Sequence, residues 1–238
     1  MRTFTFNDIR KDFVIPLFGN NREPWAPIER QYQDVPGRAG VYMRNKRVVK
    51  QRNINVPVLI HDLDTDYNEL KEELAEWLIH DEPKPLVFDD EPNRIYYAVV
   101  DGAFNPEDIV TFGKGTIPFV CPNPYKYGYE ESIILGNYPI RNEGTVEASP
   151  IFSVKFSAAA SEFTFTNDKG KFVRIIFNFV ANDLLVVDMD KRKITINNNV
   201  RMTTLDLNST WFSLQPGNNV ITVSSGATTT IIFSPRWL

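Results

Sequence analysis

The pattern of hydrophobic and polar positions becomes regular in the second part of the chain. There, apolar residues alternate with Ser, Thr and Asn in short runs, as around Phe163 and Phe165, and turns rich in Gly, Asn and Asp separate the runs. Short alternating runs with closely spaced turns are typical of an antiparallel β-sandwich or barrel. The predicted strands lie at about 150–157, 161–166, 171–178, 183–188, 192–197, 200–206, 210–214, 219–224 and 228–237.

One stretch of the first part, residues 64–80, has the period of a helix instead. Its apolar residues recur three or four positions apart and form one stripe: Tyr67, Leu70, Leu74, Trp77 and Leu78. Asp66 is placed as the N-cap, with Glu69 three residues later as its capping-box partner. Pro83 and Pro85 end the helix, which is the only one that the sequence predicts.

The rest of the first part predicts strands separated by long polar connections. They lie at about 2–6, 12–18, 40–50, 54–60, 85–88, 94–101 and 109–120. The stretch 19–39 contains three prolines and has no clear period, so it predicts an extended arm or loop. Loops of this length inside compact domains are often functional.

The charge of the chain changes near residue 140. Residues 1–144 hold 17 Lys and Arg against 23 Asp and Glu, a net of −6, whereas residues 145–238 hold 9 against 7, a net of +2. We therefore place a domain boundary at 139–145. The prediction is a mainly β chain, with a β-rich domain and one helix over 1–140 and an antiparallel sandwich over 141–238.

The overall composition excludes several classes of protein. The net charge of −4 argues against a general nucleic-acid binder. A single cysteine, Cys121, cannot form an internal disulfide. The charged N-terminal residues do not form a signal peptide, and no apolar run is long enough for a transmembrane helix.

No catalytic cluster or cofactor motif stands out. Only His61 and His80 could act as histidine bases, and neither has a Ser or Cys near it in the sequence. The adjacent acids of the Asp89–Glu91 turn could form a glycosidase pair, although neighbouring acids in a turn usually point apart into solvent. The glycines form no nucleotide-binding motif, so no cofactor is expected.

The acids at the start of the helix have part of the spacing of a calcium site. Asp62, Asp64 and Asp66 have the spacing of the first ligands of an EF-hand, and Glu73 falls at its twelfth position. Tyr67, however, occupies the position where that loop requires glycine. Acids at a helix N-terminus also interact favourably with the helix dipole, so no metal is expected.

A basic run precedes the acidic helix. No acid lies between Asp34 and Asp62, while this segment holds Arg38, Arg44, Lys46, Arg47, Lys50 and Arg52. Three interpretations stay open: a solvated face with charges that prevent strand aggregation, a nucleic-acid groove, or one edge of a subunit that assembles head to tail. For the last, the candidate inter-subunit residues are Arg44, Lys46, Arg47, Lys50 and Arg52.

Trp211 and Trp237 are candidates for stacking on sugar rings in the second domain, although Trp in a sandwich more often belongs to the core. A galectin-type site also requires His, and the second domain contains none.

Three segments carry a resemblance to a known family. The first domain ends with GKGTIPFVCPNPYKYG, the second begins with RNEGTVEASPIFSV, and it ends with TWFSLQPGNNVITV followed by SPRWL. In this order they resemble segments of the distal tail protein (Dit) family of siphophages, over essentially the whole chain.

The resemblance implies a hexameric ring made by the N-terminal domains, with galectin-like C-terminal sandwiches projecting outward. Such a hub joins the tail tube to the tail tip of the virion and is assembled in the host cytoplasm. Its partners would be the major tail protein, the tail-associated adhesion protein, and in some phages tape-measure or receptor-binding proteins, while DNA passes through the ring. The alternatives are a carbohydrate-binding sandwich protein of a phage or bacterial surface, and a cell-wall glycosidase.

Overall fold

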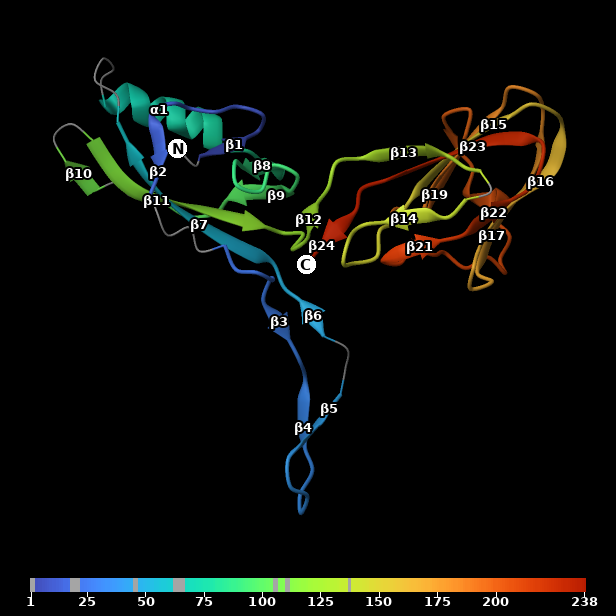
Figure 1. Cartoon of the computed structure of the whole chain (residues 1–238), viewed down its shortest axis with the longest axis horizontal. Coiled ribbons are helices and arrows are strands. Elements are labelled where there is room, and N and C mark those ends of the chain that lie inside the picture. Colours follow the sequence, from blue (N-terminus) through green and yellow to red (C-terminus); the bar gives the residue numbers. More distant parts are fainter. Residues whose placement is uncertain are drawn as a thin grey trace. The chain divides into compact units, whose positions relative to one another are not determined.

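The computed structural model describes residues 3–17, 22–44, 47–61, 67–104, 107–109, 112–136 and 138–238. The chain divides into two compact units, Met1–Lys126 with Leu238, and Tyr127–Trp237. Antiparallel strands dominate both units, and the described residues contain one α-helix, in the first unit (Figure 1). The mainly β fold predicted from the sequence is therefore confirmed.

The first unit is organised around an antiparallel sheet with the strand order β1-β8-β9-β11-β7-β2. These strands are β1 (Phe4–Phe6), β2 (Val14–Pro16), β7 (Arg52–Ile60), β8 (Lys84–Phe88), β9 (Ile95–Val100) and β11 (Phe112–Cys121), with β10 (Glu107–Ile109) paired to β11 and β12 (Lys126–Tyr127) following. Every second residue of β7 is buried, from Arg52 to Ile60. The strict alternation of this strand gives one core face and one outer face.

Helix α1 (Tyr67–Leu78) covers the core face of this sheet. Leu70, Leu74, Trp77 and Leu78, four members of the predicted stripe, are all buried. Trp77 Nε1–H donates a hydrogen bond of 3.0 Å to the carbonyl oxygen of Phe6, and its ring stacks on Phe4 at 5.7 Å. The predicted N-cap, Asp66, lies outside the described residues.

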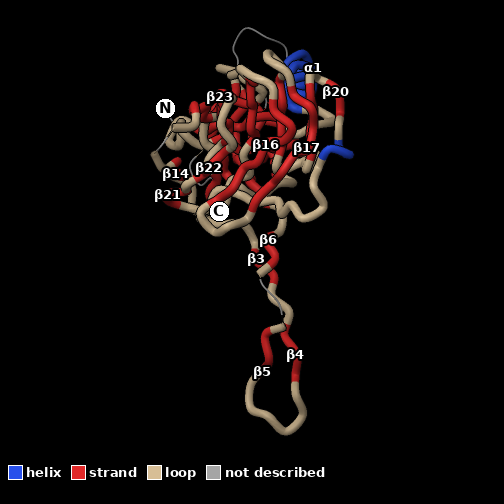
Figure 2. Tube along the Cα trace, turned by 90° about the vertical axis from the view of Figure 1, so that its right-hand side faces the viewer, coloured by secondary structure: helices blue, strands red, loops and turns tan. Residues whose placement is uncertain are grey.

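A hairpin extends from the first unit between β2 and β7 (Figures 1 and 2). It consists of two short ladders, β3 (Ile28–Glu29) with β6 (Val48–Val49) and β4 (Tyr32–Asp34) with β5 (Val41–Met43). We call residues 27–50 the arm. The sequence predicted an arm or loop at 19–39 and a single strand at 40–50; the two segments instead pair with each other because a turn at residues 36–40 reverses the chain.

The second unit contains a six-stranded antiparallel sheet and a three-stranded one. The six-stranded order is β13-β23-β15-β18-β19-β20 and the three-stranded order is β17-β16-β22, with β14 paired to β21. Their bounds are β13 (Glu131–Ile134), β14 (Ile140–Asn142), β15 (Ile151–Phe156), β16 (Ala160–Asn167), β17 (Phe172–Phe179), β18 (Leu184–Asp188), β19 (Lys193–Ile196), β20 (Asn199–Val200), β21 (Gly217–Asn219), β22 (Ile221–Val223), β23 (Ala227–Phe233) and β24 (Arg236–Trp237).

Aromatic side chains from the two sheets meet in one core. Phe156 of β15 stacks on Phe179 of β17 at 4.0 Å, and Phe152 lies 4.5 Å from Phe165 of β16. Contacts of this kind between the inner faces of two sheets define a β-sandwich. The sandwich predicted for the second part of the chain is therefore present.

Three predicted boundaries differ from the structure. The second unit begins at Tyr127, before the predicted boundary at 140/141, because β13 pairs with β23. The predicted strand 200–206 is mainly a 3₁₀ turn at Met202–Thr204. The predicted strand 210–214 is an irregular segment in which Leu214 forms an isolated bridge with Ala148.

Candidate functional site

The arm exposes apolar side chains on a ribbon of only two strands. Tyr32 lies opposite Met43, and Asp34 lies opposite Val41, so these four residues share one face. Tyr32, Val41 and Met43 are 59%, 56% and 51% exposed. Because an isolated two-stranded hairpin is marginally stable in water, this apolar face makes the arm a candidate binding surface.

The turn at the tip of the arm depends on glycine. Gly37 and Gly40 have φ values of +78° and +81°, in the left-handed region that other residues rarely adopt. They allow β4 and β5 to pair directly next to the turn.

The predicted basic edge is only partly present on this arm. Arg44 and Arg47 are exposed, and Lys50 is exposed but paired with Glu29 at 2.6 Å. Lys46 lies outside the described residues. Arg52 does not belong to this edge as the sequence predicts, because its side chain is 2% exposed and faces the interior of the first unit.

Arg52 holds the end of the arm to the sheet. Its Nε–H donates to the carbonyl oxygen of Pro124 at 3.1 Å, and Nη1–H donates to that of Glu23 at 2.7 Å. Glu23 precedes the arm and Arg52 follows it, so this one guanidinium ties both ends of the arm together. Alternation along β7 places Arg52 inward, which explains why a charged residue is buried here.

A second arginine fixes the segment that leads into the arm. Arg22 forms ion pairs with Asp90 and, at 3.4 Å, with Glu91, and its guanidinium lies 4.4 Å from the centre of the Phe88 ring. Glu91 also accepts hydrogen bonds from Lys126 at 2.9 Å and Tyr96 at 2.7 Å. Two of the three candidate glycosidase acids, Asp90 and Glu91, therefore bind basic groups at the base of the arm, and the third, Asp89, pairs with Arg10 at 3.5 Å.

These contacts change the acidity of Glu91. Burial alone would raise the pKa of this carboxyl, but the hydrogen bonds from Lys126 and Tyr96 and the charges of Lys126 and Arg22 lower the pKa below its ordinary value of 4.5. Burial and the neighbouring Glu91 raise the pKa of Tyr96. Glu91 is therefore held as a carboxylate and Tyr96 as a hydrogen-bond donor.

Acidification is expected to lower the free energy of unfolding of the first unit, because it protonates the Glu91 carboxylate. A carboxyl whose pKa is lowered by folding contributes stability that is fully present above its unfolded pKa and is lost as the pH falls through its folded pKa. The difference in free energy of unfolding between the wild type and E91Q should therefore shrink as the pH decreases below about 4.5. Urea titrations at a series of pH values measure this difference in free energy of unfolding. E82Q, at an exposed position, is the control. A difference that stays constant down to the lowest pH would contradict the expectation.

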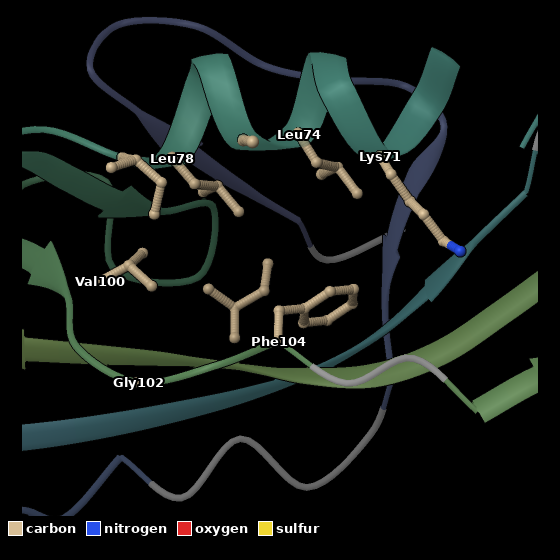
Figure 3. A pocket seen from close by; sticks show the side chains of 9 residues that line it. Lys71, Leu74, Leu78, Val100, Gly102 and Phe104 are labelled. Carbon is tan, nitrogen blue, oxygen red and sulfur yellow. The ribbon is translucent and has the colours of Figure 1, made fainter. Parts of the chain in front are cut away.

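An apolar pocket of about 420 Å³ lies between α1 and the sheet of the first unit. Figure 3 shows Leu74 and Leu78 pointing from α1 toward Val100 and Phe104, with Lys71 at one end of the pocket. Ile79, which continues the pocket wall beyond the helix, is 62% exposed. The described residues that line this pocket are mainly apolar, and Lys71 is the one charged residue among them.

The other candidate residues occupy structural positions. His80 Nε2 lies 3.1 Å from the carbonyl oxygen of Trp77, at the C-terminal end of α1, as expected from the helix dipole. Asp62, Asp64 and Asp66 lie outside the described residues, and Glu73 pairs with Lys11. No group of three or more His, Cys, Asp or Glu suitable for a metal occurs in the described parts of the chain.

The two candidate sugar-stacking residues are both partly buried. Trp211 packs against the hydrophobic core of the second unit. The Trp237 ring lies so close to Gly128 that a side-chain carbon there would sit 3.0 Å from it. Both indoles thus have packing roles, and sugar stacking on them stays a prediction of the sequence.

Of the helices in the described residues, none has the length and apolar character needed to cross a membrane.

Two family models match the chain. The model described as a phage tail protein RIFT-related domain matches residues 11–121, and the C-terminal domain of the siphovirus-type tail component matches residues 143–237. The matched segments fall within the first and second units respectively.

The chain is also similar to a curated protein and to a solved structure. It is 28% identical over 205 residues to the distal tail protein of Bacillus phage SPP1, covering 84% of this chain and 81% of the relative. The crystal structure of SPP1 Dit (gp 19.1) matches with a TM-score of 0.87 and 22% identity over 100% of both chains. That protein is described as a paradigm of the hub adsorption apparatus in phages that infect Gram-positive hosts.

Proposed function

Because the chain belongs to the distal tail protein family of siphophages, we propose that six copies form a ring that joins the phage tail tube to the host-adhesion device of the tail tip. The first unit forms the ring and the second unit decorates it. The role is structural, as a hub, rather than catalytic. Its neighbours are the major tail protein and the tail-associated adhesion protein, and DNA passes through the opening without sequence-specific contacts.

The observation that carries this proposal is the anchored arm. Arg22 and Arg52 hold both ends of the arm to the first unit, while the arm itself exposes the apolar face of Tyr32, Val41 and Met43. A ribbon fixed at its base and apolar along one face is suited to bind a neighbouring subunit. When each copy donates an arm to the next, the contact is heterologous, and such contacts form a ring when the rotation between successive copies closes.

A shortened arm tests both the ring and the part the arm plays in it. Arg44 N–H donates to the carbonyl oxygen of Gln31 at 2.9 Å, so replacing residues 32–43 with Asn-Gly closes the hairpin without moving its base. In light scattering coupled to gel filtration, the wild type is expected at six times the 27.4 kDa mass of the chain, and the shortened variant as a monomer.

The ring and the role of the arm in it can be contradicted independently by this experiment. A wild type that stays monomeric at high protein concentration would contradict the ring. A shortened variant that still forms hexamers would leave the ring in place and contradict the role of the arm. Circular dichroism on the shortened variant confirms that its β structure is retained.

A further inference from the structure

A polar pocket of about 220 Å³ lies on the outer face of the six-stranded sheet of the second unit. Across this sheet, Ile151 of β15 pairs with Ile232 of β23 on one side and with Asp188 of β18 on the other. All three residues alternate with buried neighbours along their strands, so their side chains point away from the core. The two isoleucines give the pocket an apolar floor, and Asp188 begins its polar rim.

Carboxylates with unused acceptor oxygens form part of this rim. Asp188 Oδ1 accepts hydrogen bonds from the backbone N–H groups of Asp190 at 3.0 Å and Lys191 at 2.9 Å, which fixes the turn after β18. The other oxygen, Oδ2, accepts no hydrogen bond from any residue that the structure describes. Glu130 and Asp190 also line the pocket, and neither forms an ion pair within the described ranges of the chain. These oxygens are therefore available to a ligand.

Hydrogen-bond donors lie among these acceptors. Arg236 lines the pocket, and its Nη2–H donates to Ser149 Oγ at 3.2 Å. Since Ser149 accepts this bond, its own O–H remains able to donate. Lys191 adds a second cation, and Tyr127 and Ser234 add two more hydroxyl groups.

This mixture of groups selects the chemistry of the ligand. Carboxylates only accept hydrogen bonds and the cations of Lys and Arg only donate them, whereas a hydroxyl does both. A ligand rich in hydroxyls therefore satisfies the whole rim with one kind of group. The apolar floor requires that one face of the ligand be apolar, as the C–H face of a pyranose ring is. Three acids against two bases give the lining a net charge of −1, which disfavours an anionic ligand.

We propose that this pocket binds one pyranose sugar residue, either neutral or amino-substituted. The ring lies on Ile151 and Ile232, and its hydroxyls bind Asp188 and the other polar groups of the rim. The site differs from the one predicted from the sequence, because neither Trp211 nor Trp237 is among the described residues that line it. It gives the second unit a binding role that does not depend on the proposed ring.

Saturation-transfer NMR on the full chain tests the proposal. The probes are glucose, galactose, N-acetylglucosamine and glucosamine, each at millimolar concentration because a ligand of this size binds weakly. At least one of these four sugars should receive saturation from the protein. Glucuronic acid should receive at least about threefold less than the sugar that binds best, because its carboxylate meets the negative charge of the rim.

Two substitutions of nearly unchanged shape identify the site. D188N keeps one oxygen as the acceptor of the turn and replaces only the unused oxygen by an amide group, and E130Q changes an exposed side chain in the same way. Each should weaken sugar binding by at least about tenfold, because a hydrogen bond to a charged acceptor is lost. D168N is the matched control, since it removes one negative charge from an exposed turn outside the pocket and should bind like the wild type.

The outcomes decide the site and the ligand separately. No transfer to any of the four sugars overturns the proposal, and so does equal binding by the wild type, D188N and E130Q. Stronger binding of glucuronic acid overturns the class of ligand. If D188N proves unstable in thermal unfolding, E130Q decides the site. A hexamer that binds no sugar overturns the pocket and leaves the ring, whereas a monomer that binds sugar overturns the ring and leaves the pocket.

Discussion

Replacing Phe156 with alanine is expected to lower the free energy of unfolding of the second unit by about 4 kcal/mol. Phe156 is 2% exposed and lies between the two sheets of the sandwich. It stacks on Phe179 at 4.0 Å and meets the edge of Phe163 at 5.4 Å. Truncation removes its buried apolar surface and both ring contacts, and leaves a cavity that the rigid sheets cannot close.

The effect should be confined to the second unit. Hydrogen exchange resolved by peptide during a urea titration reports the two units separately, and the first should be unchanged in F156A. L207A is the control, because Leu207 is 99% exposed and its truncation should change stability by less than about 0.5 kcal/mol. If F156A and L207A unfold at the same urea concentration, the assignment of Phe156 to the core is wrong.

Arg52→Ala is expected to cost the first unit about 3 kcal/mol. The substitution removes a large buried side chain and leaves the carbonyl oxygens of Glu23 and Pro124 without their charged donor. Hydrogen bonds from a charged group contribute about 1.5–3 kcal/mol, and the cavity adds to this cost. Since the same bonds tie the two ends of the arm together, the variant should also assemble less well.

Lys50→Ala is the matched control for Arg52→Ala. Lys50 lies two residues away and pairs with Glu29, but both side chains are about half exposed. Exposed ion pairs contribute roughly 0–1 kcal/mol, so K50A should unfold close to the wild type. Equal losses in R52A and K50A, measured by urea unfolding of the first unit, would show that the anchoring role of Arg52 is wrong.

The sequence predicts well those elements whose local pattern agrees with their packing. The helical stripe is buried as predicted because the helix has a single apolar face and that face packs on the sheet of the first unit. Its members are Leu70, Leu74, Trp77 and Leu78. Strand alternation likewise predicts the sandwich core around Phe163 and Phe165. Segment 210–214 shows the limit, since alternation alone does not supply a neighbouring strand with which to pair.

The candidate site is harder to predict because its partners are distant in the sequence. Arg52 binds backbone carbonyl groups 29 and 72 residues away, and backbone carbonyls have no sequence signature. Glu91 resembles any solvated turn acid until the fold brings Lys126 and Arg22 to it. One signal was available for Arg52: it lies in phase with the buried residues Ile54, Val56 and Val58 of β7.

The pairing of β13 with β23 constrains the order in which the chain can fold during synthesis. The strands of the order β1-β8-β9-β11-β7-β2 in the first unit are complete at Cys121, whereas the six-stranded sheet of the second unit needs Glu131 and Phe233 together. Contacts between residues so distant in sequence form slowly, and domains generally fold in N-to-C order as they leave the ribosome. We therefore expect the first unit, arm included, to fold on the nascent chain while the second is still being made, so that copies translated from one messenger RNA can meet before they are released.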